Sequence, residues 1–176
     1  MSIKQNRHIN QYQQKCNALS LQPTAHWLYV SIKEQRLYHY QVETLIKSYA
    51  VSTSKKDPNC EQDSNGTPMG LHRIAQKIGA DAPPGLIFKG RRSIGQSYQE
   101  LDTEARRNNY VTTRILWLYG MEDGVNAGEG RDSYQRYIYI HGTNLEEDIG
   151  TPQSHGCVLL TNQDIIDLYD HVPEAA

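Results

Sequence analysis

Polar and apolar residues alternate over a long stretch of this chain, and that alternation is the strongest constraint on its fold. Residues 26–53, HWLYVSIKEQRLYHYQVETLIKSYAVST, are also rich in β-branched and aromatic side chains. Successive side chains of a β-strand point to opposite faces, so the pattern predicts strands half buried in a sheet. Turns are expected near residues 33–35 and 42–44, which divide the segment into two or three strands.

More strands are expected along the rest of the chain. Strand patterns occupy residues 71–78, 113–120 and 136–143, and residues 79–91 read as a loop followed by a short strand. Loops rich in Gly, Pro, Asn or Asp fill residues 54–70 and 121–133. The polar segment 97–109 tolerates a helix. Many short strands with few helices indicate a mostly-β domain.

Helices are predicted at the two ends of the chain. Near the start, apolar residues recur at three- and four-residue steps, at Ile9, Tyr12, Cys16 and Leu19. Near the end, residues 161–172 have Thr161 as a plausible N-cap and Asp164 in the first turn. We therefore expect residues 1–25 to form a helical extension packed on a single catalytic domain, residues 26–176.

Composition excludes several classes of function. The formal net charge is −2 and no basic stripe stands out, which argues against binding of nucleic acid or an anionic membrane. No apolar run approaches the roughly 18 residues of a membrane span, and no secretory signal pattern is visible. The expected location is the cytoplasm, or the periplasm if an export signal precedes this sequence. The 3 widely spaced cysteines do not suggest a disulfide framework.

The segment Ser154–His155–Gly156–Cys157 carries the clearest chemical signal. Glycine before cysteine permits a tight turn that presents the thiol and aligns successive amides. Aligned amides stabilise an anion, so one turn could supply a nucleophile and an oxyanion hole. A thiol is mostly protonated at neutral pH and needs a base, which His141 at a strand end could provide once the chain folds back.

Two other interpretations stay open at this point. Cys157 could be an inert buried thiol, since free cysteine is often a small core residue. His141, His155 and Cys157 could instead bind zinc, although no paired-cysteine motif and no fourth ligand is evident.

The wider pattern resembles the L,D-transpeptidase (YkuD-type) catalytic domain family. The matching residues are HGT at 141–143, Gly150, SHGCV at 154–158, Asn162 and Asp164. Upstream, LYVSIKEQRLYHYQ, YAVSTSKK and GTPMG resemble the opening strands and the Thr-Pro-x-Gly turn of the family. The resemblance covers roughly residues 27–169 and implies a YkuD-like β-sandwich with a few short helices.

The resemblance also implies roles for particular residues. Cys157 would be the nucleophile, His141 the base, and the backbone carbonyl of Gly142 would orient the imidazole. The amides of His155, Gly156 and Cys157 would form the oxyanion hole. Ser154, His155 and Thr143 would contact the substrate or support the turn around it. No cofactor, metal or obligate protein partner is implied.

One position departs from the family pattern. The family usually places Arg or Asn directly after the residue that matches Val158, whereas this chain has Leu159. A polar contact to the substrate or to the loop is therefore missing. Four arginines are candidates to replace it: Arg91, Arg92, Arg131 and Arg136.

Three functions follow from this reading. The leading expectation is an L,D-carboxypeptidase that removes terminal D-Ala from murein (bacterial peptidoglycan) tetrapeptides with water as acceptor, as in murein recycling. The second is an L,D-transpeptidase that makes peptidoglycan cross-links or exchanges D-amino acids. The third is an inactive module that binds murein stems.

Overall fold

Two β-sheets form the body of the protein. The computed structural model describes residues 2–174 and 176. The smaller sheet is antiparallel and has the order β1 (His26–Ser31), β2 (Arg36–Gln41), β3 (Thr44–Ala50). The larger sheet has the order β6-β5-β7-β8-β9, and β4 also pairs with β7. Its strands are β4 (His72–Ile78), β5 (Leu86–Lys89), β6 (Arg92–Ser97), β7 (Val111–Gly120), β8 (Tyr139–Gly142) and β9 (Val158–Leu160).

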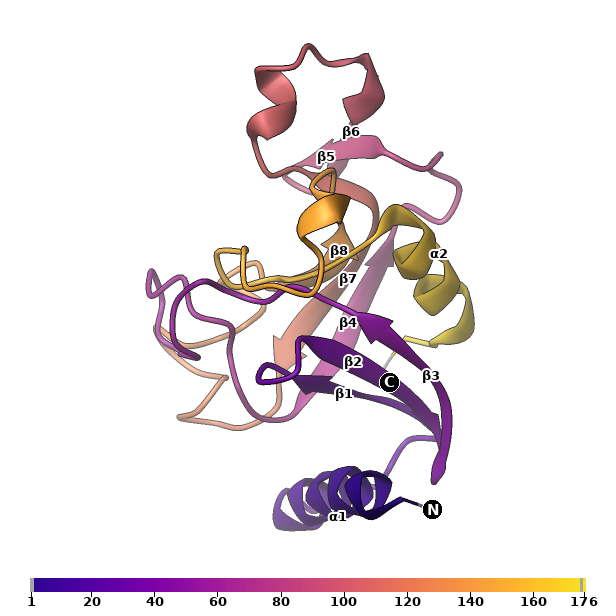
Figure 1. Cartoon of the computed structure of the whole chain (residues 1–176). Coiled ribbons are helices and arrows are strands. Elements are labelled where there is room, and N and C mark those ends of the chain that lie inside the picture. The colour runs from indigo at the N-terminus through magenta and orange to yellow at the C-terminus, as the bar shows by residue number, and fades with distance from the viewer. Residues whose placement is uncertain (1, 175) are drawn as a thin grey trace.

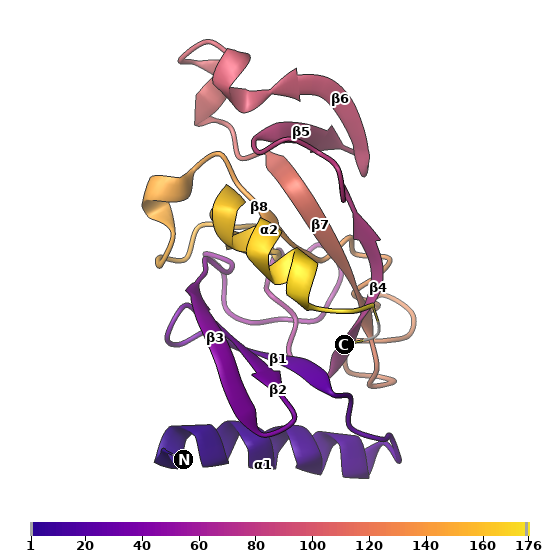
Figure 2. The same ribbon diagram turned by 90° about the vertical axis from the view of Figure 1, so that its right-hand side faces the viewer.

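The main hydrophobic core joins the two sheets and the C-terminal helix α2 (Asn162–His171). Leu37, from β2, and Leu116, from β7, are both completely buried in this cluster. Figure 2 shows α2 lying against the larger sheet, above the smaller one. The predicted mostly-β sandwich with a C-terminal helix is therefore confirmed.

Helix α2 begins where its sequence pattern predicts. The Thr161 hydroxyl accepts the Asp164 N–H at 3.1 Å, which satisfies one of the free amides of the first turn. Ile165 and Leu168 are completely buried and Tyr169 nearly so. These apolar positions form the packing face of α2 against the core.

Helix α1 (Ile3–Ala18) runs along the outer face of the smaller sheet (Figures 1 and 2). Ile9 packs with Trp27 and Tyr40 in a second cluster, and His8 Nδ1 lies 2.8 Å from the Tyr40 hydroxyl. Leu19, expected on the same helical face, follows the helix as its C-cap. No helix among the described residues is long and apolar enough to cross a bilayer.

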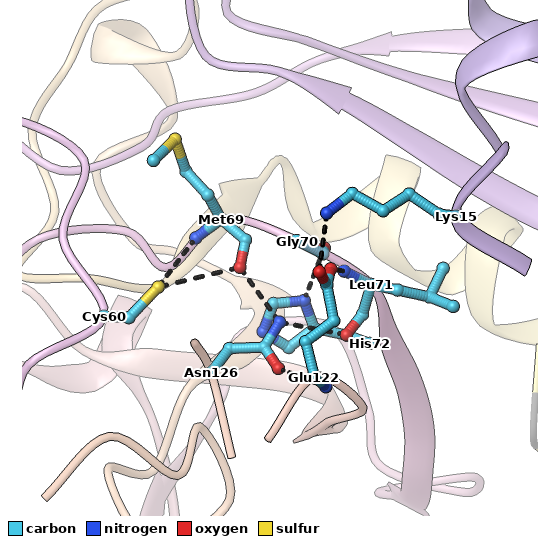
Figure 3. Close-up of polar contacts among 8 residues, drawn as sticks. All are labelled: Lys15, Cys60, Met69, Gly70, Leu71, His72, Glu122 and Asn126. Atoms are coloured by element: carbon cyan, nitrogen blue, oxygen red, sulfur yellow. Dashed lines mark hydrogen bonds and ion pairs between the residues drawn. The ribbon is translucent and has the colours of Figure 1, made fainter. Parts of the chain in front are cut away.

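A polar cluster ties α1 to two loops of the larger sheet (Figure 3). Lys15 Nζ lies 2.5 Å from Glu122 Oε2, and the other Glu122 oxygen accepts the Leu71 N–H. Asn126 Nδ2 donates to the carbonyls of Met69 and Leu71 at 2.9 and 3.0 Å. The loop before β4 and the loop after β7 are therefore held together, and α1 is anchored to both.

Two segments differ from the sequence-based expectation. The helix-tolerant segment 97–109 forms two 3₁₀ turns, η1 (Tyr98–Glu100) and η2 (Ala105–Arg107), and no α-helix. Strand β6 carries no alternation of buried and exposed residues, because it is an exposed edge strand paired only with β5. An edge strand with both faces in water has no pattern from which to predict it.

The fold is expected to lose stability in mild acid. Burial lowers the pKa of His8, His39, His72 and His141 below the ordinary value of 6.5. Below that pH the unfolded chain takes up protons on these rings while the folded chain does not, so the free energy of unfolding falls as the pH falls. We expect the thermal midpoint to drop between about pH 7 and pH 5, and less steeply in His39→Gln. A midpoint that stays constant across this interval in circular dichroism melts would contradict the expectation.

Candidate active site

The parallel pairing of β8 with β9 brings the predicted base and nucleophile together. His141 is aligned with Leu159, and Ile140 with Val158. Alternate residues share a face, so Cys157, directly before β9, lies on the same face as His141. Ile140 and Val158 face the main core instead. The β8–β9 connection thus places two residues 16 positions apart in sequence on one surface of the sheet.

His141 is buried and held in one orientation. Its Nδ1 lies 2.7 Å from the Gly142 carbonyl oxygen, so Nδ1 carries the proton and donates it. Nε2 is left unprotonated and available as an acceptor. Burial lowers the pKa of His141 to about 4, although the bond to Gly142 acts in the opposite direction. At neutral pH the ring is therefore uncharged.

The Cys157 thiol is held by the backbone of the segment that leads into β8. Its Sγ accepts the Tyr139 N–H at 3.4 Å and donates to the Tyr137 carbonyl at 3.6 Å. Burial raises the pKa of Cys157 to about 11, while the Tyr139 N–H and the Arg136 charge lower it in part. The resting pair is therefore a neutral thiol and a neutral imidazole.

Ser154 closes the turn that presents the thiol. Its buried hydroxyl donates to the Cys157 carbonyl at 2.6 Å and accepts the Gly156 N–H at 3.2 Å. The Ser154 N–H donates to the Thr53 carbonyl, which fixes the turn to the segment that follows β3. Gly156 has φ +128°, and a Cβ there would lie 3.1 Å from Ile138 Cδ1, so this position favours glycine.

A pocket of about 160 Å³ opens beside these residues. Four of the predicted site residues line it, namely His141, Ser154, His155 and Cys157. His155 is exposed at its rim. Leu159 also lines the pocket and is otherwise completely buried. The residue that departs from the family pattern therefore gives the pocket an apolar wall beside His141.

Thr143 does not line this pocket. It is completely buried, and its hydroxyl donates to Asn109 Oδ1 at 3.2 Å and accepts the Leu145 N–H. Direct contact of Thr143 with a substrate thus finds no support in the geometry. Asn109 itself lines the pocket, so the Thr143 hydroxyl bears on the site by positioning Asn109.

Three pocket residues were missed by sequence reasoning: Asn109, Tyr110 and Val111. Asn109 and Tyr110 stand directly before β7 and Val111 is its first residue, about 30 residues away from His141 in sequence. No spacing pattern links them to the SHGC segment. Only the pairing of β7 with β8 brings them to the same place.

The residues proposed as zinc ligands do not form a metal site. Within residues 2–174 and 176, no group of three or more His, Cys, Asp or Glu side chains is placed to hold a metal ion. The cysteines Cys16, Cys60 and Cys157 are all free thiols.

Cys157 is expected to react slowly with iodoacetamide in the free protein. A pKa of about 11, compared with an ordinary 9.0, leaves about 100-fold less thiolate at neutral pH. Alkylation near pH 7.5 should therefore be slower in the folded chain than in urea, and should still rise beyond pH 9. Peptide mapping by mass spectrometry separates Cys157 from Cys16 and Cys60. Faster alkylation of Cys157 in the folded chain would point to a preformed thiolate.

Comparison with known proteins agrees with the geometry of the site. The YkuD family, described as the L,D-transpeptidase catalytic domain, matches residues 25–176. A search of curated proteins finds no match.

Solved L,D-transpeptidases share the fold at low sequence identity. A structure of residues 123–326 of the Xylanimonas cellulosilytica L,D-transpeptidase is 17% identical, covers 94% of this chain and 67% of that one, and has a TM-score of 0.51. L,D-transpeptidase 3 from Mycobacterium tuberculosis, with a faropenem-derived adduct, is 12% identical over 85% of this chain and 57% of that one, with a TM-score of 0.51. The catalytic domain from the E. faecium enzyme, acylated by ertapenem, is 12% identical over 88% and 95%, with a TM-score of 0.50.

This chain spans just over half, 56%, of an L,D-transpeptidase chain from Mycobacterium smegmatis. The family match, in contrast, covers nearly all of the present chain and includes β8, β9 and the SHGC turn between them. The chain therefore belongs to the L,D-transpeptidase catalytic domain family.

Proposed function

We propose that this protein is a cysteine-dependent L,D-carboxypeptidase that releases D-Ala from murein tetrapeptides. One observation carries the proposal: β8 and β9 place His141, with Nδ1 anchored on Gly142, and Cys157 in the same pocket. A thiol beside an oriented neutral imidazole suits attack on a carbonyl followed by acyl transfer.

In the first half-reaction, Cys157 Sγ attacks the carbonyl carbon of the bond between the L-centre and D-Ala. The thiol leaves the Tyr137 carbonyl, its present partner, and its proton passes to His141 Nε2. The amides of His155 and Cys157 stabilise the oxyanion, joined by that of Gly156 once Ser154 Oγ releases it. Collapse breaks the C–N bond, D-Ala leaves with the proton from His141, and a thioester on Cys157 remains.

In the second half-reaction, water attacks the thioester. His141 Nε2 takes a proton from the water and returns it to the Cys157 sulfur as the tripeptide leaves. Water can reach this thioester from solvent, because Cys157 is partly exposed and lines an open pocket.

The test is incubation of the purified chain with a murein tetrapeptide, with and without D-Met. Mass spectrometry should detect D-Ala and tripeptide in both reactions. Absence of D-Ala release by folded, reduced protein would refute the proposal and leave a module that binds murein stems. Formation of the D-Met product in place of tripeptide would make the protein a transpeptidase.

A further inference from the structure

We propose that Arg91 binds a carboxylate of the peptide substrate near the Cys157 thiol. This inference rests on the proposed function, because it concerns how the stem peptide is held. Arg91 lies in the turn between β5 and β6, the hairpin at the upper end of the molecule in Figures 1 and 2. Gly90 and Arg91 have φ values of +56° and +67°, as a tight two-residue hairpin turn requires.

The Arg91 side chain packs on aromatic residues next to the thiol. Its guanidinium carbon lies 4.4 Å from the Trp117 ring centroid and 5.0 Å from that of Tyr137. Its Nη1 donates to the Tyr139 hydroxyl at 3.4 Å. Tyr137 and Tyr139 are also the residues whose backbone groups bond to Cys157 Sγ. Arg91 is therefore linked to the predicted nucleophile through Tyr137 and Tyr139, each of which contacts both Arg91 and Cys157.

Most of the hydrogen-bonding capacity of Arg91 is unused. A guanidinium has five N–H donors, and the long bond to Tyr139 occupies one of them. Stacking on Trp117 uses the face of the group and leaves its edges free. Within residues 2–174 and 176, no salt bridge involves Arg91. A stacked arginine with free edges is already oriented to bind a carboxylate through two parallel hydrogen bonds.

The other candidate arginines are differently placed. Arg136 donates to the carbonyls of Asn59 and Gly66 and to a serine hydroxyl, so it holds the 59–66 loop. Arg131 pairs with Glu61 and with a backbone carbonyl. Arg92 lies on the exposed edge strand β6. The three other candidate arginines are thus either bonded to protein groups or exposed to solvent.

The pocket itself offers no Lys or Arg to an anionic substrate. Its lining consists of Asn109, Tyr110, Val111, His141, Ser154, His155, Cys157 and Leu159. A stem tetrapeptide carries several carboxylates, among them the one on the terminal D-Ala. Arg91 would complement one of these charges and would make the enzyme select acidic stems over amidated ones.

The experiment compares stem peptides amidated at one carboxylate at a time. Wild-type protein should prefer the free acid about tenfold in kcat/KM at the carboxylate that Arg91 binds. Arg91→Gln should raise KM about tenfold for the acid peptide, change kcat by less than roughly twofold, and abolish the preference over the amide. Arg91→Lys should restore part of the preference for the acid peptide. Arg92→Gln changes the adjacent arginine, serves as the matched control, and should behave as wild type.

A purely structural Arg91 gives a different result. Loss of packing on Trp117 would lower the thermal midpoint and slow acid and amidated peptides equally, which would overturn the inference. An unchanged KM in Arg91→Gln would also overturn it, while leaving the proposed function standing if wild type releases D-Ala.

Failure of the proposed function is measured separately. Isothermal titration of the Cys157→Ala variant with acid and amidated peptides reports binding without turnover. In one outcome, wild type releases no D-Ala while Cys157→Ala binds the acid peptide more tightly than the amidated one. Loss of that difference in the Cys157→Ala/Arg91→Gln variant would then still support Arg91 as a carboxylate site. Absence of any peptide binding would overturn both.

Discussion

Cys157→Ala is expected to lower the rate of D-Ala release by at least about 10³-fold while leaving the protein folded. Alanine has no sulfur to form the thioester, so the two-step route through an acyl-enzyme is closed. The fold should survive, because Cys157 is only partly buried and its two hydrogen bonds, at 3.4 and 3.6 Å, are weak. The rate is measured as D-Ala by mass spectrometry, beside thermal melts of both proteins.

Cys60→Ala is the matched control for this variant. Cys60 is also a free, partly exposed thiol, and its sulfur is also hydrogen-bonded to backbone groups, those of Met69. It lies outside the pocket, so its loss should leave turnover within roughly twofold of wild type. Turnover by Cys157→Ala close to wild type would exclude Cys157 as the nucleophile.

His141→Gln is expected to lower kcat/KM by about 10²–10⁴-fold. Glutamine is close to histidine in size, so the local packing is largely kept. It cannot accept a proton from the thiol at neutral pH, and the high pKa of Cys157 means that the thiol needs such an acceptor. Steady-state kinetics on the tetrapeptide give the ratio to wild type.

His155→Gln separates the two histidines of the pocket. His155 is exposed at the rim, whereas His141 is buried and aligned beside β9. We expect the change at His155 to act mainly on KM, by a few-fold, because its backbone amide remains in place. Equal losses of kcat in the two variants would mean that His155 takes part in proton transfer, and would contradict the assignment of the base to His141.

Local patterns predicted much of the fold. Alternation in residues 26–53 corresponds to β1, β2 and β3, with turns where they were expected. Thr161 caps α2 as its position suggested. Such features depend on residues close together in sequence, so they can be predicted from the sequence alone. Strand β6 and the 3₁₀ turns could not be predicted from the sequence, because an exposed edge strand and short turns have no periodic pattern of apolar residues.

The candidate site was predictable in part for the same reason. The residues from His141 to Cys157 form one compact motif, so the sequence alone was enough to nominate the base, the thiol and the turn. Asn109, Tyr110 and Val111 carry no such mark, and the sequence offered Arg91 only as one of four candidate arginines. The positions of these residues depend on the pairing of β7 with β5 and β8.

The sequence by itself determined the β class of the fold, the C-terminal helix and the identity of the predicted base and thiol, since each is encoded by a local pattern. Only the tertiary structure decided the state of that pair and its surroundings. Burial makes Cys157 and His141 a neutral pair, and Leu159 becomes an apolar wall of the pocket. The β5–β6 hairpin brings Arg91 next to the tyrosines that hold the thiol. Desolvation and contacts between distant segments exist only once the chain has packed, and no local pattern records them.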